Sequence, residues 1–171
     1  DALRAAGAKL VRFDTLSDTH LPNVDALFIG GGFPELFAAE LEANAALRTT
    51  IRNAIEAGLP VYAECGGLMY LARTLTHQGH SFRMVGAIPG DVVMHERPVG
   101  RGYVNLEETA AFPWPSASAC NAVVRAHEFH YSSLENLPPD LRFAYTVKRG
   151  HGIDGRHDGI VTHNVLASYA H

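Results

Sequence analysis

The stretch Pro60-Val61-Tyr62-Ala63-Glu64-Cys65-Gly66-Gly67 decides the fold of this 171-residue chain. Its first half is a short apolar run that suits a buried strand, and an amphipathic helix is expected after Gly67. One face of that helix carries Leu68, Leu71, Ala72 and Leu75. A cysteine between strand and helix lies on a tight turn at the carboxyl edge of a sheet, where only small neighbours fit. The stretch therefore predicts an α/β fold with a nucleophile at Cys65.

A second glycine-rich turn precedes this stretch in the chain. The buried strand Ala26–Ile29 ends at Gly30-Gly31-Gly32-Phe33-Pro34-Glu35, and parallel strands would bring this turn beside Cys65. Amides of Gly31 and Gly32, together with the N–H of Gly66, could then hold an oxyanion. A phosphate-binding loop is the competing interpretation, but no Lys-Ser or Lys-Thr follows the glycines. An ordinary tight turn remains the plain alternative.

The rest of the chain predicts strands and helices in alternation, followed by strands alone. A helix tail at Asp1–Gly7, a strand at Leu10–Phe13 and a helix from the Asn44 cap to Ala57 belong to the first half. The second half has five strand-like segments: 85–94, 102–107, 122–130, 141–148 and 159–169. We expect one domain with a mainly parallel sheet, extended by antiparallel strands in the C-terminal half.

Composition excludes several functional classes. The formal net charge is −4 with no basic patch, so we expect no nucleic-acid partner. No apolar run approaches the ~20 residues that span a bilayer, and no signal peptide opens the sequence. The two cysteines, Cys65 and Cys120, do not suggest a disulfide scaffold, and we assign Cys120 no role. A cytoplasmic location is the expectation.

The glycine turn and the cysteine turn together resemble a known family. The strings Gly30 to Glu35 and Tyr62-Ala63-Glu64-Cys65-Gly66-Gly67-Leu68-Met69-Tyr70-Leu71 resemble the glutaminase domain of cobyrinic acid a,c-diamide synthases, a branch of the class I glutamine amidotransferases. The resemblance continues through His127-Glu128-Phe129-His130-Tyr131-Ser132 and Ala167-Ser168-Tyr169-Ala170-His171. It implies the class I glutamine amidotransferase-like (flavodoxin-like) fold, with three layers and helices on both sheet faces.

The resemblance also implies a reaction and its residues. Cys65 matches the family nucleophile, and His171 matches its general base. Members use L-glutamine as an ammonia source to amidate the a and c carboxylates of cobyrinic acid in cobalamin biosynthesis. ATP and Mg²⁺ act in an N-terminal synthetase domain, and the corrinoid lies at the domain interface. We therefore expect residues 1–171 to be the glutaminase part of a longer ligase, without that domain and the first strand, and without a cofactor of its own.

Several alternatives stay open. Related synthases act on hydrogenobyrinic acid or nickel-sirohydrochlorin, and a stand-alone cysteine hydrolase or a non-catalytic module could share the fold. A homodimer is also open. Many class I relatives carry a glutamine four residues after the cysteine, where this chain has Met69, and a glutamate two residues after the histidine, a position beyond His171.

Other histidines compete for the roles of base and metal ligand. The dipole of the helix after Cys65 is expected to favour the thiolate. His130 is a weaker rival of His171, and Glu128 shares its strand face, so the two could contact each other or the pocket. Three further histidines, His151, His157 and His163, lack the tight spacing of zinc motifs, so no metal site is expected.

Overall fold

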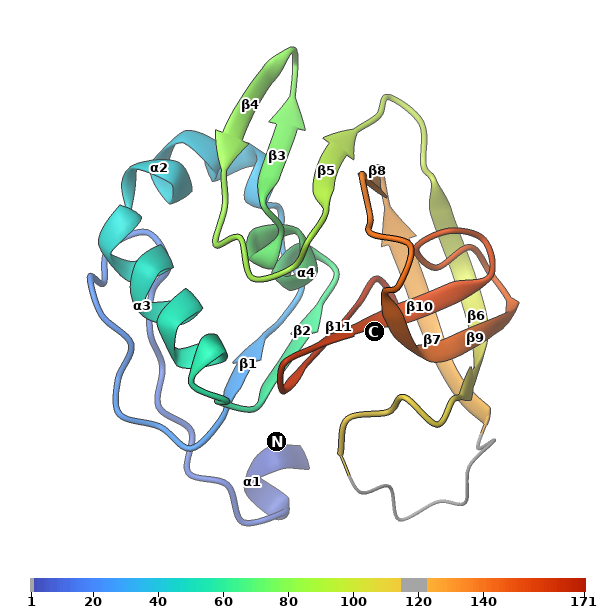
Figure 1. The fold of residues 1–171 in the computed structure, drawn as a ribbon, viewed down its shortest axis with the longest axis horizontal. Helices are drawn as coiled ribbons and strands as arrows, with labels where there is room; N and C mark the ends of the chain where they lie inside the picture. Colours follow the sequence, from blue (N-terminus) through green and yellow to red (C-terminus); the bar gives the residue numbers. More distant parts are fainter. Residues whose placement is uncertain (1, 115–122) are drawn as a thin grey trace.

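The computed structural model describes residues 2–114 and 123–171, which form two sheets (Figure 1). The larger sheet has the strand order β1-β2-β11-β10-β9-β6-β7, and the smaller has the order β4-β3-β5-β8. The strands of the larger sheet are β1 (Leu27–Ile29), β2 (Val61–Glu64), β6 (Gly100–Glu108), β7 (Val123–His130), β9 (Arg142–Arg149), β10 (His157–Thr162) and β11 (Val165–Ser168). Those of the smaller sheet are β3 (Thr74–His77), β4 (His80–Arg83), β5 (Asp91–Met94) and β8 (Ser132–Glu135).

The helices are short apart from α3. They are α1 (Ala2–Ala5), the 3₁₀ helix η1 (Pro34–Phe37), α2 (Ala38–Ala43), α3 (Ala45–Glu56) and α4 (Gly66–Leu71). Helix α3 begins as expected, because the side chain of Asn44 accepts a hydrogen bond from the Leu47 N–H at 3.3 Å. Leu47, Ile51 and Ile55 on its apolar face are fully buried. No helix in the described ranges is both long and apolar enough to cross a membrane.

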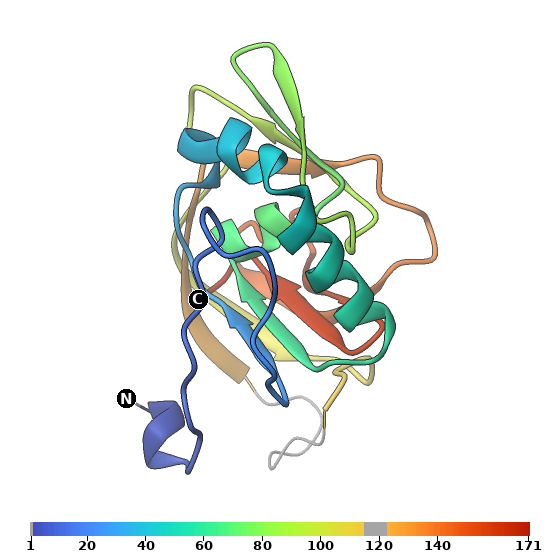
Figure 2. The same cartoon turned by 90° about the vertical axis from the view of Figure 1, so that its left-hand side faces the viewer.

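The larger sheet is mixed, and its two faces are covered differently. Strands β1, β2 and β11 run parallel, whereas β10, β9, β6 and β7 join them antiparallel, so antiparallel strands make up more of the sheet than expected. Helices α2, α3 and α4 cover one face over the main core (Figures 1 and 2). Strand residues such as Val104, Leu106 and Ala144 form a smaller core against the opposite face of β10 and β11. In the described residues the curled strands therefore take the place of a second helical layer.

The turn between β2 and α4 is tightly packed against the turn that follows β1. A Cβ added to Gly66 would lie 2.6 Å from the carbonyl oxygen of Gly32. A Cβ added to Gly67 would lie 2.1 Å from the carbonyl oxygen of Ile29. Real Cβ atoms do not approach backbone oxygens this closely, so both positions require glycine. The small neighbours that the sequence predicted for this turn are therefore explained by backbone-to-backbone contact.

Two expectations for the first half are wrong. Leu10–Phe13 is not a strand, and Leu10 and Val11 are exposed, because no strand in the described residues pairs with this segment. The helix after Cys65 ends at Leu71 instead of continuing to Leu75. Leu75 is buried on β3, since Ala72 takes an extended conformation and the strand pairs with β4 and β5.

The second half contains more turns than predicted. The segment 159–169 is a hairpin instead of a single strand, and His163, with φ of 50°, begins the reversal between β10 and β11. Only the end of the expected strand 85–94 is extended, as β5, and the sequence did not predict β8 or the β3–β4 hairpin. That hairpin turns at Gln78 and Gly79, which have φ of 52° and 78°. Cys120 lies outside the described residues.

The contact between the two turns predicts that adding one methyl group at Gly67 lowers the stability of the fold strongly. Gly67→Ala should lower the free energy of unfolding by about 3 kcal/mol, because the new Cβ must displace the backbone at Ile29. Gly32→Ala is the matched control, since a Cβ there would have no atom of the described residues within 4 Å. Urea denaturation of both variants measures the difference. Equal stability of the two variants would show that the turns are not packed in this way.

Candidate active site

Cys65 occupies a strained turn at the carboxyl end of β2. Its backbone has φ of 47° and ψ of −102°, a conformation that residues with a side chain rarely adopt. Two hydrogen bonds hold it: the Cys65 N–H donates to the carbonyl of Ser168 at 2.8 Å, and the Met69 N–H donates to the Cys65 carbonyl at 3.1 Å. The first bond extends the β2–β11 ladder and the second begins α4. The sheet and the helix therefore fix the cysteine from both sides.

The thiol itself is largely covered. Cys65 is 9% exposed, and its Sγ faces the carbonyl oxygen of Phe129 on β7 at 3.8 Å. Burial raises the pKa of the Cys65 thiol to about 11, although a hydrogen bond from the Gly66 N–H acts in the opposite direction. The expectation that the dipole of α4 would favour the thiolate is not met, because the loss of hydration outweighs the effect of a six-residue helix. At neutral pH this site holds a thiol that needs a base.

The glycine turn after β1 lies beside the cysteine, as expected from parallel pairing of β1 and β2. A Cβ built on Gly31 would lie 3.9 Å from the Cβ of Cys65. Gly32 contacts the backbone of Gly66, whose N–H lies next to the sulfur. The turn thus brings together the three glycines that the sequence suggested for an oxyanion site. Whether their amides hold an oxyanion stays a prediction.

His171 reaches the same region by pairing with β7. Its N–H and carbonyl form hydrogen bonds with the carbonyl and N–H of His127, each 2.9 Å long. Phe129, which the Cys65 thiol faces, is two residues further along β7, so the two anchor points lie roughly 7 Å apart. The His171 ring is exposed, and its Nδ1 is 3.3 Å from the carbonyl oxygen of Tyr169. In the tautomer in which Nδ1–H donates a hydrogen bond to that carbonyl, Nε2 is the unprotonated, basic nitrogen.

Glu128 and His130 share the inner face of β7 and are both buried. Their side chains approach to 3.8 Å, between Oε2 of Glu128 and Nε2 of His130. Glu128 accepts hydrogen bonds from the N–H groups of His151 and Gly152 at 2.7 and 2.8 Å. Burial opposes its charge, but these bonds and His130 together lower the pKa of Glu128. Glu128 therefore holds the loop before β10, and both side chains are buried. His171, in contrast, is exposed to solvent.

Tyr169 connects this buried pair to the end of the chain, and no separate role for it was predicted. Its ring stacks on His130 with centroids 3.7 Å apart, and its hydroxyl is 2.9 Å from the hydroxyl of Ser132. His130 Nδ1 is 2.8 Å from the carbonyl oxygen of Ser132. The signal available in the sequence was the position of Tyr169 two residues before the candidate base His171. In the described ranges, no group of His, Cys, Asp and Glu side chains is arranged to hold a metal ion.

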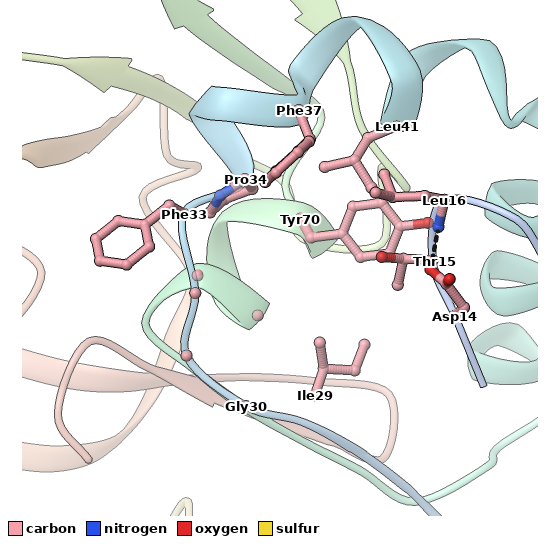
Figure 3. Close-up of a pocket in the computed structure, with 14 residues that line it drawn as sticks. Asp14, Thr15, Leu16, Ile29, Gly30, Phe33, Pro34, Phe37, Leu41 and Tyr70 are labelled. Carbon is pink, nitrogen blue, oxygen red and sulfur yellow. Dashed lines mark hydrogen bonds between the residues drawn. The ribbon is translucent and has the colours of Figure 1, made fainter. Parts of the chain in front are cut away.

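A pocket of about 290 Å³ lies between the glycine turn and the segment Asp14–Leu16 (Figure 3). Gly30–Gly32, Gly66 and Gly67 line one part of it, and Cys65 is not among its lining residues. Tyr70 points across it toward Asp14–Leu16, and its buried hydroxyl has no hydrogen-bond partner among the described residues. The thiol therefore faces β7 instead of this pocket.

Comparison with known sequences identifies relatives along the whole chain. The family model of the CobB/CobQ-like glutamine amidotransferase domain matches residues 1–171. The chain is 48% identical over 171 residues to a cobyrinate a,c-diamide synthase of Magnetococcus marinus, and 42% identical over 187 residues to one of Methanosarcina barkeri. These alignments cover 100% of this chain but only 36% of each relative. The chain thus spans about a third of the length of these relatives.

Solved structures show the same fold at low sequence identity. A protein described as a glutamine amidotransferase has a TM-score of 0.70 and 17% identity, covering 99% of this chain and 81% of its own. PurLQS from Thermotoga maritima has a TM-score of 0.67, also at 17% identity, covering 91% of this chain and 72% of its own. At this identity the likeness shows the fold alone. It confirms the expected class I glutamine amidotransferase-like architecture.

The raised pKa of Cys65 predicts how its reactivity depends on pH. In a Cys120→Ala background, the rate of alkylation by iodoacetamide should keep rising about tenfold per pH unit up to about pH 10, because only the thiolate reacts. Mass spectrometry of the Cys65 peptide at successive times measures this rate. A plateau below pH 8 would mean that the resting site already holds a thiolate, contrary to the burial described here.

The buried Glu128 predicts a pH-dependent contribution to stability. Glu128→Gln should lower the free energy of unfolding by about 1–3 kcal/mol at pH 7, because an amide cannot accept both loop N–H groups. The folded pKa is lowered, so the wild-type advantage is present above the unfolded pKa and disappears as the pH falls through the folded pKa. Denaturation at pH 7 and pH 3, with the exposed Glu56→Gln as control, tests this. A pH-independent difference would contradict it.

Proposed function

This chain belongs to the family of CobB/CobQ-like glutamine amidotransferase domains, and on that premise we propose that it hydrolyses L-glutamine at Cys65. One observation carries the proposal. The strained turn of Cys65 lies beside the glycine turn, and its thiol faces β7, the strand with which His171 pairs. A nucleophile, N–H donors and a base within one site are the parts that acyl transfer from an amide requires.

In this mechanism His171 begins the reaction. Its Nε2 takes the proton of the Cys65 thiol while Nδ1–H donates to the Tyr169 carbonyl, which fixes the tautomer. The thiolate attacks the side-chain amide carbon of glutamine, and the resulting oxyanion accepts hydrogen bonds from Gly66 and from Gly31 or Gly32. The imidazolium returns its proton to the leaving nitrogen, so that ammonia departs and a γ-glutamyl thioester remains. Water then releases glutamate and restores the thiol.

The raised thiol pKa gives the base a specific task. A thiol with a pKa of about 11 is almost entirely protonated at pH 7, so the site is unreactive until a proton acceptor comes within reach. In the described residues the Cys65 thiol contacts the Phe129 carbonyl and the His171 ring contacts the Tyr169 carbonyl, so the two side chains are not bonded to each other. We infer that glutamine binding, or contact with the rest of the enzyme, brings them together. Such a requirement would limit wasteful hydrolysis.

We further propose that the ammonia amidates the a and c carboxylates of cobyrinic acid in cobalamin biosynthesis. The support is the name carried by relatives that are 42% and 48% identical to this chain. Because the chain spans 36% of their length, ATP and Mg²⁺ would act in a part of the polypeptide outside it, with the corrinoid at the interface. A cytoplasmic location belongs to this proposal, and a homodimer is compatible with it.

The test compares two nitrogen sources in the natural polypeptide that contains this chain. Cys65→Ala should lower glutamine-dependent amidation by at least about 1,000-fold, yet keep amidation that is fed with ammonium chloride. Cys120→Ala is the matched cysteine control and should keep both activities. Product formation and glutamate release are followed separately.

The outcomes distinguish the alternatives. Retained glutaminase activity in Cys65→Ala would exclude the nucleophile assignment. Glutamate release without amidation of any tetrapyrrole would favour a stand-alone hydrolase. Amidation of hydrogenobyrinic acid or nickel-sirohydrochlorin in preference to cobyrinic acid would move the enzyme to a related synthase.

A further inference from the structure

The chain changes direction between β11 and His171. In a strand, successive N–H groups point to opposite sides. The N–H groups of Tyr169 and Ala170 instead point to one side, toward a single carboxylate, that of Asp158. The backbone has therefore left the strand conformation directly after Ser168. This turn takes the chain from the β2–β11 ladder to the edge of β7, where His171 pairs with His127.

Asp158 is the side chain that holds this turn. It lies on β10 opposite the end of β11 and is fully buried. Its Oδ1 accepts from the N–H of Tyr169 at 3.1 Å and from Gly159 at 2.8 Å, and its Oδ2 accepts from the N–H of Ala170 at 3.0 Å. In the described ranges it has no cationic partner within ion-pair distance. Desolvating a carboxylate is costly, and among the described residues these three backbone N–H groups are what offsets that cost.

Ser168 supports the same turn from inside it. Its hydroxyl donates to the carbonyl of Ala170 at 2.6 Å, and its own carbonyl accepts the N–H of Cys65. The turn thus begins at Ser168, which is hydrogen-bonded to Cys65, and ends at His171, the candidate base. The carbonyl of Tyr169, inside the turn, faces Nδ1 of His171. Backbone groups that Asp158 binds therefore act together with the pairing to His127 in placing His171, and the Tyr169 carbonyl orients its ring.

We propose that Asp158 is a positioning residue for His171, which it places beside Cys65 by binding the backbone N–H groups of Tyr169 and Ala170. The proposal rests on the proposed function, because it takes His171 as the base. The carboxylate acts on the backbone before the histidine instead of on the imidazole. In the described part of the chain, no carboxylate accepts a hydrogen bond from the His171 ring, whose contacts are the Tyr169 carbonyl and the ring of His127.

Glu128 does not fill this role, although it is the other buried carboxylate of the region. Its two oxygens bind the N–H groups of His151 and Gly152 and approach His130. None of these groups belongs to the Ser168–His171 turn. The two carboxylates therefore hold different segments. Glu128 binds the loop before β10, and Asp158 binds the turn after β11.

The test uses Asp158→Asn in the natural polypeptide that contains this chain. Asparagine keeps the size of the side chain but replaces one acceptor oxygen by an NH₂ group that faces a backbone N–H. The expected result is a 10- to 100-fold lower kcat for glutamine hydrolysis, with the KM for glutamine changed less than threefold and ammonia-fed amidation unchanged. Asp154→Asn is the matched control. Asp154 also accepts two backbone N–H groups, those of Arg156 and His157, but neither belongs to the Ser168–His171 turn, so Asp154→Asn should keep the wild-type kcat.

A double-mutant cycle separates positioning from general weakening. If Asp158 acts through His171, Asp158→Asn combined with His171→Ala should be no slower than His171→Ala alone, within about threefold. Losses that multiply, or an unchanged kcat in a folded Asp158→Asn, would overturn the positioning role. Full activity of His171→Ala would instead overturn the base assignment of the proposed function. Where Asp158→Asn does not fold, the same cycle with Ser168→Ala decides, with non-multiplying losses expected and multiplying losses contradicting the proposal.

Discussion

The structure depends on the close approach of two backbone turns, one after β1 and one after β2. Gly66 and Gly67 have no side chains, so the start of α4 rests directly on the carbonyls of Gly32 and Ile29. This contact leaves Cys65 with a positive φ and directs its side chain toward β7. The parallel register of β1 and β2 then has a chemical consequence, because it sets the glycine turn beside the sulfur.

The site is assembled from the edge of one strand and the ends of two others. β7 offers its free edge at Phe129 to the thiol and at His127 to the backbone of His171. Burial keeps the sulfur protonated, while the imidazole stays exposed to solvent and to any domain that covers it. A protonated nucleophile that is not bonded to the nearby imidazole leaves the resting site unreactive until a proton acceptor reaches the thiol.

The sequence predicted those parts of the molecule whose signals are local. The Asn44 cap, the helix that follows it and the Cys65 turn between strand and helix each depend on a few neighbouring residues, and each was found. Leu10–Phe13 was predicted as a strand on composition alone, but a strand also needs a partner, which the described residues do not provide. The role of Asp158 could not be read from the sequence either, because its partners lie eleven and twelve residues away across a hairpin that was predicted as one strand. The raised thiol pKa likewise depends on burial by β7, which no local pattern encodes.

Covalent trapping of the nucleophile tests the central claim most directly. An electrophilic analogue of glutamine should add one equivalent of label to the Cys65 peptide, and free glutamine should protect it, because the Cys65 thiol attacks the amide carbon. Digestion and mass spectrometry locate the label. Labelling of Cys120 or of a histidine with Cys65 unmodified, or labelling of Cys65 that glutamine does not slow, would contradict the account.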